Sequence, residues 1–281
     1  MIYILEIYSL SGPSGTGKST AALSFAHDHG IDGIIDDGLF IVKGKKIAGT
    51  SAKFEKSAFK AVKRAIFTDE DHLHEVQNAI KEQGIDKILI IGTSDRMTKN
   101  IAERLAIGEI QYLYHIENLR TSCEMKLAKF IRKTEGKHIM PIPVVQVEQN
   151  FFKRFIQKGV EIFSPKKEKI GETTIVQPDF HQAIEHVEKQ QFVQIIKHAC
   201  EEGELIEKVT KVHFELLPLP KTMISIVLSG PINLNEQIPI DKVQRNIMHA
   251  FEKEFELELQ SIDVNIISIQ NEKNKELAIH K

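Results

Sequence analysis

The chain of 281 residues is long enough for two domains of ordinary size, and its hydrophobic fraction of 42% is typical of a globular protein. With 37 Lys and Arg against 39 Asp and Glu, its net charge of −2 gives no general attraction to nucleic acid or to an anionic membrane. No segment approaches the length of a membrane span and no secretory signal pattern opens the chain, so we expect a cytoplasmic protein. The two cysteines, Cys123 and Cys200, lack metal-ligand spacing and are expected to be free thiols.

The first predicted strand, Ile2 to Ser9, is a nearly continuous apolar run, which is typical of a strand buried on both faces of a parallel sheet. The glycine-rich segment "SGPSGTGKST" follows it, and a helix is predicted from Lys18 to His29, ending at Gly30. Strand, loop and helix in this order are the context in which a glycine-rich loop binds phosphate. A glycine-rich turn that binds nothing is the alternative.

This loop fits the G-x-x-x-x-G-K-[ST] pattern known as Walker A. Glycines let backbone N–H groups approach phosphate oxygens, Lys18 reaches the β- and γ-phosphates, and the Ser19 hydroxyl binds Mg²⁺. The helix adds unpaired N–H groups and the positive end of its dipole. The expected nucleotide-binding residues are Gly12, Ser14, Gly15, Thr16, Gly17, Lys18, Ser19 and Thr20.

Strands and helices alternate up to about residue 163. A hairpin is predicted in "LFIVKGKKIAG", with its turn near Gly44. Helices are predicted over 56–67 and 69–83, with Thr68 as cap of the second and Gly84 at its end. The buried strand "KILII" is then followed by a helix over 98–105, a strand over 109–116, a helix over 118–133 and a proline-containing edge segment over 136–147. This order predicts an α/β, P-loop NTPase-like domain: a mostly parallel sheet with flanking helices and a nucleotide at the carboxyl ends of the strands.

Two adjacent carboxylates, Asp36 and Asp37, follow a short apolar strand about eighteen residues after Lys18. In such a position one carboxylate can face the Mg²⁺ held by Ser19, while its neighbour acts as a general base. An Asp-Asp-Gly turn without any chemistry fits the spacing equally well.

The stretch over residues 12–50, "GPSGTGKSTAALSFAHDHGIDGIIDDGLFIVKGKKIAGT", resembles the nucleotide-binding core of the HPr kinase/phosphorylase family. That family has a P-loop, a helix and then a paired Asp-Asp after a short strand. The resemblance implies that ATP is the nucleotide, although GTP also fits, and that Mg²⁺ is the cofactor. It further implies that Asp36 takes the proton of the acceptor, that Asp37 helps to hold the metal, and that Lys18 serves the transferred phosphate.

Asp95, in "IIGTSD", is a second candidate for the metal site, because P-loop proteins often place an aspartate after a neighbouring buried strand. Thr93 and Ser94 would then lie where the γ-phosphate can be sensed. The alternative is that Ser94 and Asp95 cap the following helix.

Two segments are locally basic: residues 120–138 and 153–169 each hold six Lys and Arg against two Glu. Solvated helix surface is the simpler interpretation, and a lid or partner-docking face beside bound phosphates is the alternative. In the first segment, Arg120 and Arg132 are possible stabilisers of a transferring phosphate.

The composition becomes polar and proline-flanked over 164–179, which predicts a linker or an edge hairpin between a nucleotide-binding domain (1–163) and a smaller α+β domain (180–281). The second domain is predicted to contain helices over 180–200 and 241–255 and strands over 208–217, 223–228 and 257–269. In the last strand, alternating Ile262, Val264 and Ile266 predict one buried face. The segment "IPIDKVQRNIMHAFEKEFELELQSIDVNIISI" is similar to the end of the bacterial alkaline-shock (Gls24-type) family, which implies an interaction or assembly module.

These features predict an ATP-binding, Mg²⁺-dependent phosphoryl-transfer protein with a kinase-like core. A nucleotide-dependent switch or scaffold, whose second domain binds a protein partner and which hydrolyses slowly or not at all, is the alternative. A vestigial nucleotide site is a third. The sequence leaves open whether the acceptor is a protein or a small molecule, and whether the chain forms a homo-oligomer.

Overall fold

The computed structural model describes residues 5–147, 156–178, 186–201, 206–230 and 240–270. The chain forms two compact units, the first comprising residues 1–121 and 131–185 and the second comprising 122–130 and 186–281. Residues 164–179, for which the sequence predicted a linker or an edge hairpin, belong to the first unit. None of the described helices is long and apolar enough to cross a membrane.

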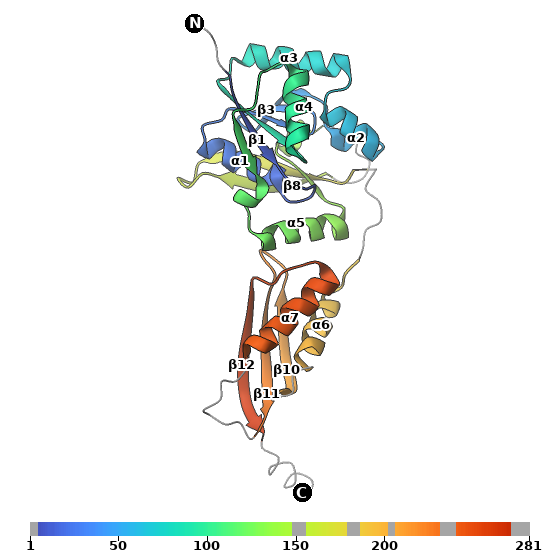
Figure 1. The fold of residues 1–281 in the computed structure, drawn as a ribbon, viewed down its shortest axis with the longest axis vertical. Helices are drawn as coiled ribbons and strands as arrows, with labels where there is room; N and C mark the ends of the chain where they lie inside the picture. The colour runs from blue at the N-terminus through green and yellow to red at the C-terminus, as the bar shows by residue number, and fades with distance from the viewer. Residues whose placement is uncertain (1–4, 148–155, 179–185, 202–205, 231–239, 271–281) are drawn as a thin grey trace, which may run out of the picture. The chain divides into compact units, whose positions relative to one another are not determined.

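The first unit is built on a six-stranded sheet with the strand order β4-β3-β2-β5-β1-β6. Two of its strands, β1 and β3, are labelled in Figure 1. The strands are β1 Glu6–Ser11, β2 Gly33–Asp36, β3 Leu39–Val42, β4 Lys45–Gly49, β5 Lys87–Gly92 and β6 Tyr112–His115. Strands β2, β5, β1 and β6 pair in parallel, whereas β3 and β4 join by antiparallel pairing. The predicted mostly parallel sheet of an α/β fold and the hairpin with its turn at Gly44 are therefore confirmed.

Helices cover both faces of this sheet, because alternate residues of each buried strand point to opposite sides. The α-helices of the first unit are α1 Lys18–Asp28, α2 Ala58–Ala65, α3 Glu70–Gln83, α4 Asp95–Leu105 and the end of α5 Ser122–Glu135. Leu10 of β1 packs with Leu23 of α1 in the core of one face, while Ile7 packs with Val76 of α3 and Ile101 of α4 in the core of the other. Short 3-10 turns connect these elements: η1 Ala52–Phe54, η2 Ile116–Asn118 and η3 Val144–Gln146.

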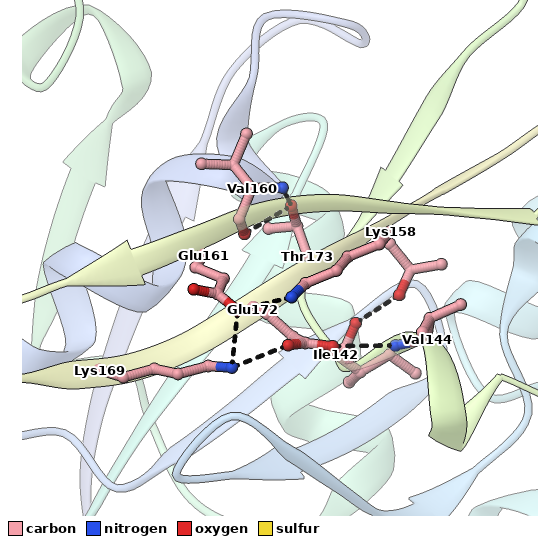
Figure 2. Close-up of polar contacts among 9 residues, drawn as sticks. Ile142, Val144, Lys158, Val160, Glu161, Lys169, Glu172 and Thr173 are labelled. Carbon is pink, nitrogen blue, oxygen red and sulfur yellow. Dashed lines mark hydrogen bonds and ion pairs between the residues drawn. The ribbon is translucent and has the colours of Figure 1, made fainter.

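A small antiparallel sheet, in the order β7-β9-β8, completes the core on the α1 side. Its strands are β7 His138–Met140, β8 Ile156–Phe163 and β9 Lys169–Val176. Figure 2 shows how side chains tie this sheet together: Glu172 accepts hydrogen bonds from Lys169 Nζ at 2.9 Å and from the Val144 backbone N–H at 3.3 Å. In the same view, the Thr173 hydroxyl lies between the backbone N–H and C=O of Val160, at 2.9 and 3.2 Å.

The second unit is α+β. Its elements are α6 Lys189–Glu201, β10 Ile206–Glu215, β11 Lys221–Ser229, α7 Ile240–Phe255 and β12 Ser261–Gln270, with the first part of α5. Strand β11 pairs antiparallel with β10 and parallel with β12. Phe192 of α6 contacts four phenylalanine rings, those of Phe130, Phe214, Phe251 and Phe255, at centroid distances of 5.9, 4.6, 5.7 and 4.5 Å. This aromatic cluster forms the core between the helices and the sheet.

Four local predictions need correction. Asp69, and not Thr68, caps α3, because its carboxylate accepts the His72 backbone N–H. Helix α5 begins at Ser122, after a turn held by hydrogen bonds to Ile116 O, and α6 begins only at Lys189. In β12 the buried face stops early, since Ile266 is 41% exposed. The predicted residues 2–4 of the first strand and 180–185 of the helix before β10 lie outside the described part of the chain.

Candidate functional site

The glycine-rich loop lies between the end of β1 at Ser11 and the start of α1 at Lys18, as the sequence predicted. Its backbone favours glycine at three positions, and Gly15 has a φ of 83°. Gly17 has a φ of 88°, in the left-handed region, and a Cβ at Gly12 would lie 2.4 Å from the Ile116 side chain. Helix α1 has no side-chain cap and no acidic residue in its first turn, so its first N–H groups have no competing anion.

Lys18 is folded back onto this loop. Its Nζ donates hydrogen bonds to the carbonyl oxygens of Gly12 and Pro13 at 2.7 and 2.8 Å, and the residue is 8% exposed. Burial lowers the Lys18 pKa to about 8, against the opposing effect of Asp36 and Asp37. The ammonium is thus held over the loop at the position where a phosphate oxygen would supply better compensation than a carbonyl dipole.

The Asp-Asp-Gly segment is both a turn and a charged site. Asp36 is the last residue of β2, and Asp37 with Gly38 forms the two-residue turn to β3, with φ values of 49° and 87°. Positive φ at both turn residues is typical of a tight β-hairpin. The predicted turn is therefore confirmed, and it carries the two adjacent carboxylates.

Asp36 is 3% exposed, and its Oδ2 is buried without a hydrogen-bond partner. Burial raises its pKa to about 6, while Lys53 and a hydrogen bond from Ser19 oppose the rise. Asp37 is affected in the opposite direction: burial disfavours its charge, but Lys53, Arg132 and His138 outweigh burial and lower its pKa. The two neighbouring carboxylates therefore differ in proton affinity, with Asp36 the more basic.

Lys53 on η1 lies closer to Asp37 than to Asp36, and it contributes to the difference between their pKa values. The sequence analysis did not identify this lysine. Its Nζ lies 2.5 Å from Asp37 Oδ2 and 3.9 Å from Asp36 Oδ2. The backbone holds this arrangement, because the Ser51 side chain caps η1 and the Ala52 N–H donates to Asp37 O at 2.7 Å. A lysine sixteen residues after Asp37 carries no local sequence signal, so only the tertiary fold reveals it.

His72 anchors the same turn from α3. Its Nε2 lies 2.8 Å from Gly38 O and 3.1 Å from Thr50 N, and its ring stacks on Phe67 at 4.9 Å. Burial lowers its pKa, so the imidazole is neutral in the folded protein at neutral pH. The sequence gave no sign of this structural role.

Two arginines approach the site, as the sequence allowed. A Cβ at Gly17 would lie 3.2 Å from Arg120 Cζ, so the Arg120 guanidinium lies directly against the loop, and its Nε is buried without a partner. Arg132, on the last turns of α5, is close enough to influence the pKa values of Lys18, Lys53 and Asp37. Arg120 precedes α5 and does not lie on it, which corrects the sequence interpretation.

Asp95 lies next to Ser11, the last residue of β1 before the loop. It is the first residue of α4, and Ser94 caps the helix as the alternative interpretation predicted. Asp95 Oδ1 accepts the Ser11 hydroxyl at 2.5 Å, and its Oδ2 lies 3.2 Å from His115 Nε2. Its neighbour Thr93 contacts the Met97 sulfur at 3.3 Å. These contacts link β1, β6 and α4 just before Gly12, so Ser11 and His115 engage the Asp95 carboxylate.

The oxygen donors near the loop suit a magnesium ion that shares its coordination with phosphates. Ser19 and Asp36 lie together, Asp36 Oδ2 accepts no hydrogen bond, and Asp37 adds a second carboxylate. Mg²⁺ prefers oxygen and commonly takes one or two carboxylates plus phosphate oxygens. Within the described ranges, no group of three or more His, Cys, Asp or Glu side chains forms a metal site by itself.

No protein-family model, no curated protein and no solved structure matches the chain.

Proposed function

We propose that this chain is an ATP-binding, Mg²⁺-dependent phosphoryl-transfer protein whose first unit has a kinase-like, P-loop NTPase-type site. One observation carries the proposal: Lys18, at the start of a helix with an open first turn, rests on loop carbonyls beside a buried carboxylate that has an unpartnered oxygen. Lys18 and Ser19 are assigned to the phosphates and the metal. The backbone of residues 12–17 and Thr20 completes the phosphate-binding loop.

The charges around the loop support a polyanionic ligand. Lys18, Lys53, Arg120 and Arg132 carry four positive charges, whereas Asp36 and Asp37 carry at most two negative charges. Concentrating unmatched cations in a partly buried place is unfavourable unless a ligand compensates them. A nucleoside triphosphate supplies that compensation, and Mg²⁺ bound with it supplies charge neutralisation at the phosphates.

The carboxylates divide the remaining chemistry. Asp36, the more basic of the two, takes the proton of the acceptor hydroxyl as the acceptor oxygen forms its bond to the γ-phosphorus and the bond to the leaving β-phosphate oxygen breaks. Asp37, held ionised by Lys53, is assigned to the metal. Asp95 is assigned an outer role, because Ser11 and His115 occupy its oxygens.

Equilibrium binding of ATP and of GTP at millimolar Mg²⁺, together with nucleotide turnover, tests the proposal in the wild type, Lys18→Ala and Asp36→Asn. Lys18→Ala should lose binding, and Asp36→Asn should bind nucleotide but lose turnover. Lys87→Ala is the control for the first, since Lys87 begins β5 and pairs with Glu6 at the start of β1, whereas the loop follows the end of β1. Asp32→Asn, at an exposed ion pair with Lys43, is the control for the second.

Absence of nucleotide binding by the wild type would refute the proposal. Binding without turnover in the wild type would instead favour the nucleotide-dependent switch, in which the same loop and metal residues hold the ligand but Asp36 accepts no proton.

A further inference from the structure

Lys53 places an ammonium where two carboxylates converge. Its side chain is 7% exposed, against 4% for Asp36 and 37% for Asp37, and it lies within 4.0 Å of both. Asp37 and Asp36 are the two largest electrostatic causes that keep the Lys53 ammonium charged despite its burial. The three side chains therefore form one charge cluster, buried at Lys53 and Asp36 and partly exposed at Asp37, in which a lysine supplies the cation.

Hydrogen bonds of the backbone hold the two segments that carry this cluster. Ser51 Oγ accepts the Lys53 N–H at 3.2 Å, and the Ala52 N–H donates to Asp37 O at 2.7 Å. His72 holds the next residue of the turn through Gly38 O. The turn that carries Asp37 and the 3-10 turn that carries Lys53 are thus fixed to one another.

We propose that Lys53 is an internal counter-ion that makes divalent-cation binding conditional on nucleotide. In the nucleotide-free protein its ammonium already balances one of the two carboxylate charges, and a divalent ion entering beside it meets a buried positive charge at close range. When phosphates bring several negative charges, Lys53 and the divalent ion are both compensated and can be held together. The metal therefore arrives with the nucleotide, and the empty loop does not accumulate it.

This inference rests on the proposed function for the identity of the anionic ligand, but its test with the metal alone does not. Binding of Mn²⁺ without nucleotide is measured by electron paramagnetic resonance at pH 7.5 in the wild type and in Lys53→Met, which removes the ammonium and keeps the length of the side chain. Lys53→Met should bind Mn²⁺ about tenfold tighter or more, because the variant lacks the ammonium that lies within 4.0 Å of both carboxylates. Lys60→Met, at an exposed lysine of α2, is the matched control and should behave like the wild type.

The double variant Lys53→Met with Asp37→Asn should lose the gain, which assigns the new ion to the carboxylate pair. Lys53→Arg keeps the positive charge and should bind Mn²⁺ as weakly as the wild type. Lys53→Gln keeps a hydrogen-bond donor for Asp37 and replaces Lys53→Met if that variant fails to fold.

Folded Lys53→Met and Lys53→Gln variants that bind Mn²⁺ no tighter than the wild type would overturn the inference, as would an equal gain in Lys53→Arg. A gain in Lys53→Met alongside a wild type that binds no nucleotide would uphold the counter-ion role while refuting the proposed function.

Discussion

The Lys53 ammonium lies 2.5 Å from one carboxylate of a neighbouring pair, that of Asp37, and 3.9 Å from the other, that of Asp36. This asymmetry gives two adjacent residues of the same type opposite pKa shifts, down for Asp37 and up for Asp36. Two titratable groups whose surroundings separate their proton affinities are typical of an acid–base site. The relationship leads to a prediction for the stability of the protein as well as for its chemistry.

We expect Asp36→Asn to stabilise the fold at neutral pH. Burial raises the Asp36 pKa from 3.8 to about 6, so the folded protein binds more protons than the unfolded chain between these values, and stability falls as the pH rises through this window. Above this window, keeping Asp36 charged costs about 3 kcal/mol of stability, a cost that the amide of Asn does not carry. In urea denaturation at pH 7.5, the free energy of unfolding of the variant should exceed that of the wild type by about this amount. The difference should vanish near pH 4.

Asp32→Asn, at a carboxylate 45% exposed, should show no such pH-dependent gain. A variant at Asp36 that is less stable than the wild type at pH 7.5 would mean that Lys53 and Ser19 outweigh burial, contrary to the raised pKa.

Arg120→Met is expected to slow phosphoryl transfer more than it weakens nucleotide binding. The guanidinium lies against Gly17, where it can stabilise the charge that develops on the transferred phosphate, and such arginines contribute large factors to kcat. We expect kcat to fall about 100-fold or more, with less than about a tenfold change in the dissociation constant for ATP. Arg245→Met, at an exposed position of α7, is the control. Equal losses in binding and kcat would assign Arg120 to ground-state binding alone.

His72 should make the fold acid-sensitive. Its pKa is lowered chiefly by burial, so the folded protein keeps it neutral while the unfolded chain takes up a proton below the ordinary value of 6.5. Stability contributed by the neutral ring is therefore present above that value and is lost as the pH falls. His72→Gln should lose less unfolding free energy than the wild type between pH 7.5 and 5. His74→Gln, two residues away and exposed, should keep the wild-type slope.

Local patterns predicted those parts of the molecule that local chemistry decides. The apolar strand, the glycine loop and the uncapped helix follow from residues 5–30, and the hairpin at Gly44 follows from its turn sequence. The predictions for the buried face of β12 and for the first residue of α6 were wrong. Packing against the rest of the unit determines both features, and periodicity alone does not.

The candidate site was predictable only in its first half. Gly12, Lys18 and Asp36 lie at spacings in the sequence that are typical of a phosphate-binding loop followed by a carboxylate. Lys53, in contrast, is brought next to Asp36 and Asp37 by the β3–β4 hairpin and η1. Arg120 was singled out as a cation, but its contact with Gly17 depends on the turn after β6 and not on the basic helix where the pattern placed it. Contacts made by the fold between distant segments leave no periodic trace in the sequence.

The two free cysteines should differ sharply in reactivity, although both belong to the second unit. Cys200 on α6 is fully buried, and burial raises its pKa to about 12, so little thiolate exists and reagents reach it only when the unit opens. Cys123 is partly exposed at the start of α5, where its Sγ donates to Glu258 O at 3.4 Å, and its pKa is raised by partial burial and by two glutamates.

Cys123 should therefore react with a disulfide reagent at pH 8 at least about 100-fold faster than Cys200. Cys200→Ala should remove the slow phase and Cys123→Ala the fast one, and sub-denaturing urea should accelerate only the slow phase. Equal rates for both thiols in the native protein would show that α6 is not held in the phenylalanine core, since Cys200 lies on the helix that carries Phe192.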